Sequence, residues 1–217
     1  MTHDIEDLIA LFDGVFAPSY RTRLVIGGDE PIYLPADAEH AFHRIVFAHG
    51  FFASALHEVS HWCIAGESRR QQEDYGYWYE PDGRDAGRQA DFERVEIAPQ
   101  ALESLFSEAC GKPFQVSVDN LDGVEVDRRA FSVKVAARAR RYRSEGIPLR
   151  AQALIDALEV FYATEGDSTK GGVTKGDATE GDSTGQALEK AVAAGRRRLE
   201  AGSATRPAAR AADVDTA

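Results

Sequence analysis

Apolar residues near the N-terminus recur every three or four positions, from Ile5 to Phe16, which predicts an amphipathic helix. Pro18 follows soon after the expected end of this helix. Three short runs rich in Val, Ile, Tyr and Phe then predict strands over 22–26, 31–34 and 44–48.

The second part of the chain is mostly helical by the same criteria. A strongly apolar helix is expected over 51–65, ended by Gly66, and one extended run over 114–118 alternates as a strand. Further helices are predicted over 99–109, with Pro99 at the start, over 127–144, and from after the separator at 146–148 through 162. The pattern predicts an α+β fold, a single domain with a small sheet and a central helix over 51–65. It does not predict the strand order.

The C-terminal quarter has a different composition. The heptapeptide ATEGDST occurs at 163–169 and again at 178–184, in a stretch without large apolar residues that cannot offset the entropy cost of folding. The folded domain is therefore predicted over residues 1–163. Residues 164–217 are predicted to be a low-complexity linker and a disordered tail, with one short helix over 186–199.

The formal net charge of −11 lies entirely on residues 1–165, because the rest holds equal numbers of basic and acidic residues. This sign argues against nucleic acid as a partner, and it suits a basic partner or solubility alone. No apolar run reaches the roughly 18 residues of a membrane span. The acidic N-terminus is unlike an export signal, so a cytoplasmic protein is expected, and Cys63 and Cys110 are predicted to be buried thiols.

The helix over 51–65 contains a His-Glu-x-x-His motif, with His57 and His61 four residues apart. On a helix these positions differ by about 40° around the axis and about 6 Å along it, so both imidazoles can reach one metal ion. Paired histidines on a helix can also be ordinary core or surface groups. The apolar flanks and the absence of Lys and Arg between 45 and 68 favour a metal.

A third protein ligand is needed, and no histidine follows His61. The downstream candidates are Glu93 and Glu96. Glu96 lies between Val95 and Ile97 and is preferred, whereas Glu93 has charged neighbours; either could be an exposed glutamate.

Three other features could belong to the site. Glu58, inside the motif, is in the position of a general base or of a group that orients water. His49 precedes the helix and could serve as a proton donor, or be a structural histidine bonded to a backbone carbonyl. The aromatic cluster over 75–79 could line a substrate cleft or pack in the core.

Two histidines and a carboxylate serve two chemistries. With zinc this ligand set makes a hydrolase, and with iron(II) it leaves positions for O₂ and a substrate. The motif alone favours the hydrolase, that is, a zinc metallopeptidase of the HExxH type. A metal-stabilised binding module without turnover is a third hypothesis.

Longer runs of the sequence resemble the bacterial elongation factor P hydroxylase family, over about residues 5–163. These runs are far more specific than the five-residue motif. They are DEPIYLPADAE (29–39), RIVFAHGFFASALHEVSHWCIAG (44–66), YGYWYEPDGRDA (75–86), VEIAPQALESLF (95–106) and FQVSVDNLDG (114–123).

The resemblance implies a metal-dependent monooxygenase that hydroxylates the lysine of elongation factor P already bearing a β-lysyl group. It implies that His57, His61 and Glu96 bind one divalent metal, expected to be Fe(II), with O₂ as co-substrate. Elongation factor P is then the expected partner, with no nucleic acid and no membrane. The electron donor and the oligomeric state are not implied.

Overall fold

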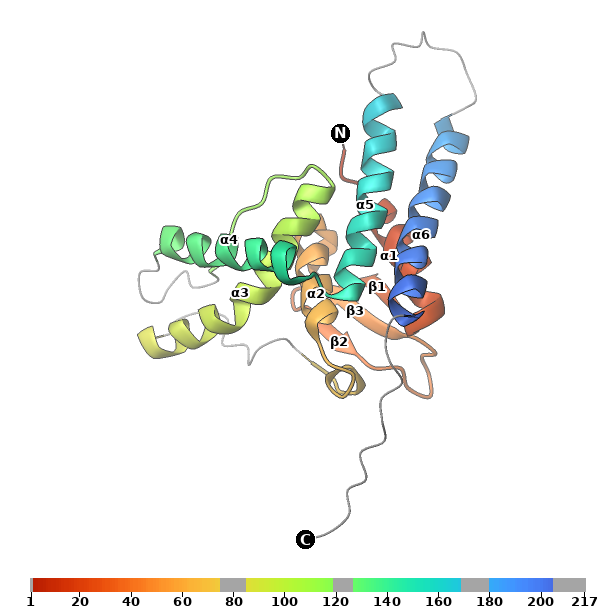
Figure 1. The fold of residues 1–217 in the computed structure, drawn as a ribbon. Coiled ribbons are helices and arrows are strands. Elements are labelled where there is room, and N and C mark those ends of the chain that lie inside the picture. The colour runs from red at the N-terminus through yellow and green to blue at the C-terminus, as the bar shows by residue number, and fades with distance from the viewer. Residues whose placement is uncertain (1, 75–84, 119–126, 169–179, 205–217) are drawn as a thin grey trace.

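The structure is a computed structural model that describes residues 2–74, 85–118, 127–168 and 180–204 (Figure 1). Within these residues the structure has six α-helices and one three-stranded sheet, so the predicted α+β class is confirmed. The elements are α1 (Ile5–Tyr20), β1 (Thr22–Ile26), β2 (Ile32–Leu34), β3 (His43–Phe47), η1 (Ala48–Gly50), α2 (Phe52–Ile64), η2 (Arg69–Gln71), α3 (Ala86–Ala109), α4 (Arg128–Glu145), α5 (Leu149–Ser168) and α6 (Glu180–Ala204).

The sheet has the strand order β1-β3-β2. The central strand β3 pairs in parallel with β1, where Leu24 lies opposite Ile45, and antiparallel with β2. Leu24, Ile45 and Phe47 are buried in the same core as the apolar stripe of α1. The sheet therefore forms one wall of the core, and α2 follows its central strand β3 after the short turn η1.

The central helix α2 begins after a tight turn at the end of β3. His49 and Gly50 in this turn have φ angles of 52° and 71°. Leu56 and Val59 on one face of α2 are fully buried, which agrees with the predicted apolar stripe. Helix α2 contacts α3 and α5, so it lies inside the molecule (Figure 1).

Arg150 of α5 closes the C-terminal end of α2. Its Nη2 donates to the carbonyl oxygens of Trp62, Cys63 and Ala65 at 2.9, 3.1 and 2.6 Å. These are among the last carbonyls of the helix, which have no partner within it. The guanidinium also lies 4.8 Å from the centre of the Trp62 ring. Helix α2 is therefore fixed at the end that follows His61.

Two helix boundaries predicted at prolines are wrong, and α5 also continues beyond its predicted end at 162, to Ser168. Helix α1 continues to Tyr20 with Pro18 inside it, and α3 begins at Ala86, so Pro99 lies in the helix interior rather than at its start. A proline removes one amide donor and leaves the carbonyl four residues earlier without its helical partner. For Pro18 that carbonyl belongs to Gly14, and Arg196 of α6 donates to it at 2.8 Å.

The strand predicted over 114–118 is not a strand. The Gln100 side chain accepts from the amide of Ser117 at 3.0 Å and donates to its carbonyl at 2.8 Å. A side-chain amide thus takes the place of a neighbouring strand. The aromatic cluster predicted over 75–79 lies outside the described residues.

Helix α6 lies within the stretch predicted to be linker and tail, and it is longer than the helix predicted over 186–199. It packs side by side with α5 and against α1 (Figure 1). Small or apolar residues every four positions face this interface, namely Ala187, Ala191, Gly195 and Leu199. A Cβ on Gly195 would lie 2.8 Å from the carbonyl oxygen of Ala153 and from a methyl of Val15.

The domain boundary at residue 163 stays a prediction, because residues 169–179 and 205–217 lie outside the described part. Both predicted thiols, Cys63 and Cys110, are buried. None of the described helices combines the length and the apolar character that a membrane crossing requires.

The packing of α6 predicts that the C-terminal region contributes to stability. Truncation after Ser168 removes Leu199 and the small-residue contacts, and we expect it to lower the free energy of unfolding by at least about 2 kcal/mol. In a chain of this size that corresponds to a Tm lower by roughly 4–8 °C. Truncation after Ala204 keeps α6 and is the control. Equal Tm values for the two truncated chains would contradict the prediction.

Candidate metal centre

The two motif histidines lie on the side of α2 that faces α3. Their Nε2 atoms are 3.2 Å apart, and their side chains are 23% and 25% exposed. The rings meet edge to face with centroids 4.8 Å apart. Helical spacing alone brings His57 and His61 together, as the sequence predicts.

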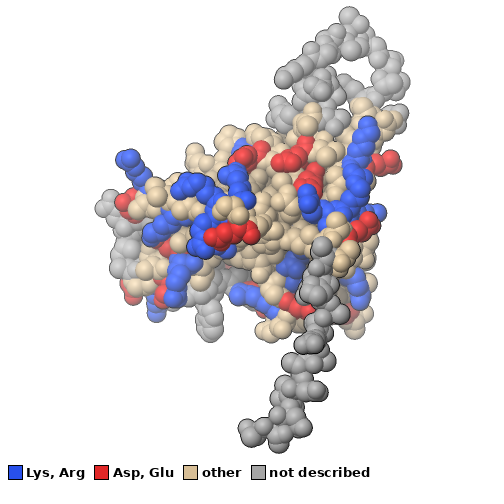
Figure 2. Space-filling model, viewed as in Figure 1, with Lys and Arg blue, Asp and Glu red and all other residues tan. Residues whose placement is uncertain are grey.

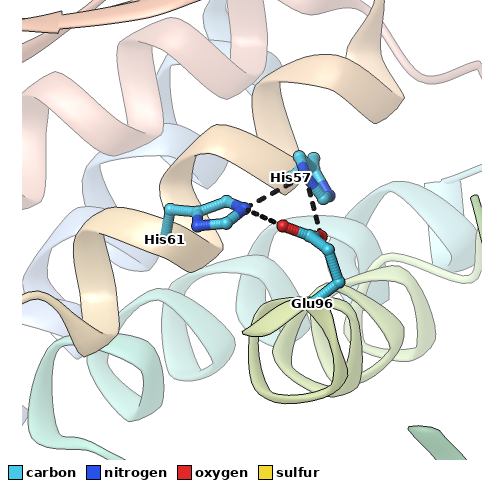
Figure 3. A group of neighbouring side chains, drawn as sticks. All are labelled: His57, His61 and Glu96. Carbon is cyan, nitrogen blue, oxygen red and sulfur yellow. Dashed lines mark hydrogen bonds and ion pairs between the residues drawn. The ribbon is translucent and has the colours of Figure 1, made fainter. Parts of the chain in front are cut away.

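Glu96 of α3 completes the group. Its Oε1 lies 3.2 Å from His61 Nε2, and its Oε2 lies 3.5 Å from His57 Nε2 (Figure 3). Glu96 is 4% exposed. The other candidate, Glu93, instead forms an ion pair with Lys134 of α4 at 2.9 Å. The structure therefore places Glu96, and not Glu93, beside the two histidines.

The spacing of the three side chains fits a metal ion. One ligand atom from each lies within 4.8 Å of the others. Nitrogen and oxygen ligands bind such ions at about 2.0–2.2 Å, so two ligand atoms at angles of about 90–110° are about 3–3.5 Å apart. The two Nε2 atoms, 3.2 Å apart, fall in this range, and so does the distance from each of them to one Glu96 oxygen, 3.2 Å from His61 to Oε1 and 3.5 Å from His57 to Oε2. The residues are thus able to hold one ion between α2 and α3.

A buried polar stripe on α3 supports Glu96. Gln100 donates to Glu96 Oε2 at 3.3 Å while its amide also binds Ser117. The stripe has helical spacing, and its members are Gln89, Glu96, Gln100, Glu103 and Ser107. Buried polar side chains are costly unless they are paired, so this face of α3 is built for polar partners on α2.

Glu103 is the residue of the site that sequence reasoning missed. Its Oε2 lies 2.9 Å from His57 Nδ1, so Nδ1–H donates to the carboxylate and Nε2 is the nitrogen that points toward Glu96 and His61. Glu103 follows Glu96 by seven residues, two helical turns, and this spacing was the available signal. Histidines that bind metals commonly have such a carboxylate partner.

The carboxylates dominate the electrostatics of the group. Burial opposes the charged form of His57, but the hydrogen bond that its ring donates to Glu103 and the charges of Glu96, Glu58 and Glu103 outweigh burial and raise its pKa to about 10. Burial likewise opposes ionisation of Glu96, yet the hydrogen bond and charge of His61 lower its pKa to about 2. The carboxylates therefore favour a positive charge at this site, either as a proton on His57 or as a bound cation.

The two predicted catalytic residues lie in different surroundings. Burial raises the pKa of Glu58, which sits among the charges of His57 and His61. His49 is exposed and pairs with Asp29, with His49 Nε2 3.1 Å from Asp29 Oδ1. In the described part of the chain His49 has no hydrogen bond or ion pair with His57, His61 or Glu96. The partner of its ring is the Asp29 carboxylate rather than the backbone carbonyl that was predicted. The catalytic role of either residue stays a prediction.

Comparison with known proteins agrees with this geometry. The family model described as elongation factor P hydroxylase matches residues 11–171, which include all of α2 and α3. A protein of Haemophilus influenzae named elongation factor P lysine hydroxylase is 52% identical over 167 residues, which are 77% of this chain and 94% of that protein. The chain belongs to the elongation factor P hydroxylase family.

Proposed function

We propose that this chain hydroxylates a lysine side chain of elongation factor P, and that the lysine already bears a β-lysyl group. The observation that carries the proposal is the family match, which spans both helices that bring His57, His61 and Glu96 together. The name of the Haemophilus influenzae relative gives the reaction class and the protein substrate of that protein. The enzyme inserts one oxygen atom of O₂ into a C–H bond. The other oxygen leaves as water and takes two electrons from a reductant.

His57, His61 and Glu96 hold the metal in this proposal, and the metal is iron(II). An iron(II) ion bound by two histidines and one carboxylate supplies activation of O₂, since the ligand set leaves coordination positions open. Glu103 keeps the His57 ring in the tautomer whose Nε2 is free to bind. Burial raises the pKa of Glu58, and its position next to His57 makes it available to orient water or a neighbouring group beside the metal.

The charge of the site suits the proposed substrate. Glu58, Glu96 and Glu103 place three carboxylates around two imidazoles. In the described residues, the ion pairs of Glu96 and Glu103 are with histidines and not with Lys or Arg. A divalent metal balances part of this negative charge, and the remainder attracts the cationic lysine and its β-lysyl amines.

The first prediction concerns the ligands. His57→Ala, His61→Ala and Glu96→Ala each remove one ligand, and we expect loss of stoichiometric metal with the helical content retained. Glu93→Ala is the matched control, because Glu93 lies one helical turn from Glu96 and pairs with Lys134 instead. Metal content by mass spectrometry and circular dichroism make the measurement. Full metal content in the two histidine variants would refute the assignment.

The second prediction is a pH dependence of metal binding. The raised pKa of about 10 means that metal-free His57 carries a proton at neutral pH, which the metal must displace. Glu96 stays ionised, because its pKa is about 2. The affinity for Co²⁺ should therefore rise by about tenfold per pH unit from pH 6 to 8.5.

In Glu103→Gln the main interaction that raises the pKa of His57 is lost. In this variant the rise of Co²⁺ affinity with pH should level off near neutral pH. The affinity reached at high pH should be about 10–100-fold lower than in the wild type, because the His57 ring is less well oriented. Titration with Co²⁺, followed by visible absorbance at a series of pH values, measures both the pH dependence and the limiting affinity. A slope that is identical in the wild type and in Glu103→Gln would contradict the role given to Glu103.

The third prediction is the reaction. Iron-loaded enzyme, reductant, O₂ and β-lysylated elongation factor P should give a product heavier by one oxygen atom. The gain should be absent without O₂ and in Glu96→Ala. The competing hypothesis is a zinc peptidase in which Glu58 is the general base. Cleavage of peptides by the zinc form, in the absence of O₂, would favour that hypothesis and overturn ours.

A further inference from the structure

Helix α4 carries a charge opposite to that of the rest of the chain. Seven of the 25 Lys and Arg residues of the protein lie between Arg128 and Glu145, together with a single acid, Glu145. The helix thus has a formal charge of +6 in a chain with a net charge of −11. Blue side chains gather over α4 in the space-filling view (Figure 2).

The positive charge is on the surface. A single narrow stripe of α4 is buried, formed by Phe131, Val135, Ala139 and Tyr142. The opposite face carries Arg129, Val133 and Arg140, and Val133 is 61% exposed. Arg129 and Arg140 are eleven residues apart, which places them within about 20° of one another on a helix. The outward face is thus an exposed valine between two arginines.

The fold neutralises only part of this charge. Lys134, Arg141 and Arg143 have acidic partners. Arg129 and Arg140 make no ion pair with any residue in the described ranges. Like charges three or four residues apart on a helix are mildly unfavourable, as for Lys134 with Arg138 and Arg140 with Arg143. Helix stability alone therefore gives no reason for a face of one sign.

The position of α4 links this face to the metal centre. Lys134 pairs with Glu93, one turn before Glu96, and Arg143 pairs with Glu108, just over one turn after Glu103. These two ion pairs bracket the segment of α3 that contributes to the site. When the modified lysine of a protein substrate enters between α2 and α3, the part of the substrate surface around that lysine is within reach of α4.

We propose that the outward face of α4, defined by Arg129, Val133 and Arg140, binds an acidic surface of the protein substrate. The proposal rests on the proposed function, because it takes the substrate to be a protein. The enzyme then holds its substrate at two places of opposite sign: a cationic lysine at the carboxylates and an acidic patch at α4. Complementary charge of this kind speeds encounter and fixes orientation.

A protein partner fits this face better than a nucleic acid. A long phosphate backbone would extend beyond α4 onto a molecule that is otherwise strongly acidic, whereas a protein patch needs only local complementarity. The exposed Val133 also suits a protein surface, since interfaces combine apolar contacts with arginine.

The test is the double charge reversal Arg129→Glu/Arg140→Glu in the full-length enzyme. The matched control is Lys190→Glu/Arg197→Glu on α6, where both side chains are exposed and the change in net charge is the same. We expect the α4 variant to raise KM for intact elongation factor P by about tenfold or more with kcat nearly unchanged. The effect should shrink as salt rises, because salt screens exposed charges.

A short peptide that carries the modified lysine should react equally with the wild type and both variants. Equal KM values for the two variants on the intact protein would overturn the proposal. A loss of transfer RNA binding in the α4 variant, with binding of elongation factor P unchanged, would also overturn it and assign the face to nucleic acid.

Direct measurement of Kd for elongation factor P separates this inference from the proposed function. If the wild type shows no turnover but the α4 variant binds elongation factor P more weakly than the wild type does, the docking proposal is supported and the proposed reaction is overturned. Turnover with a Kd that α4 does not affect supports the reaction and overturns docking.

Discussion

The pairing of Glu96 with two imidazoles across the α2–α3 interface is the interaction on which the rest of the structure depends. A carboxylate that is 4% exposed is costly in a protein interior unless positive or polar groups surround it. His57 and His61 meet this need from one face of α2. Because three carboxylates face two histidines, the group is most stable when a further cation is present. The same requirement that keeps the helices together therefore favours a metal.

The surrounding elements keep this pairing in register. Arg150 binds the carbonyls that follow His61, and the turn at His49 and Gly50 fixes the start of α2. On the other helix, Gln100 connects Glu96 to the backbone of Ser117. Each of these contacts acts on a helix end or on a side chain next to a ligand. A small error in any of them would shift the ligand atoms, and metal geometry tolerates little displacement.

Hydrophobic periodicity was enough to predict α2 to within one residue at each end, because its apolar stripe is continuous. Glu103 and Gln100 could not be predicted so easily, since polar residues on a helix are usually exposed and their burial depends on which helix packs opposite. The alternation over 114–118 suggested a strand because a side-chain partner such as Gln100 leaves no signal in local sequence. Helix α6 extends further than predicted because alanine and glycine pack closely against α1 and α5 without large apolar residues.

Net charge is a poor guide to this protein because the two signs are separated in space. Attraction between carboxylates and a modified lysine cannot by itself select one protein, since exposed lysines are common on all proteins. Specificity requires a second contact that wrong partners lack or oppose. In the proposed docking, helix α4 is that second contact. A partner with an acidic patch at the correct distance from its lysine binds more tightly because the patch meets the arginines of α4. A generally basic protein is attracted by the rest of the surface but is repelled by these arginines. Opposite charges on neighbouring helices thus allow the enzyme to attract a cationic side chain without binding every cationic protein.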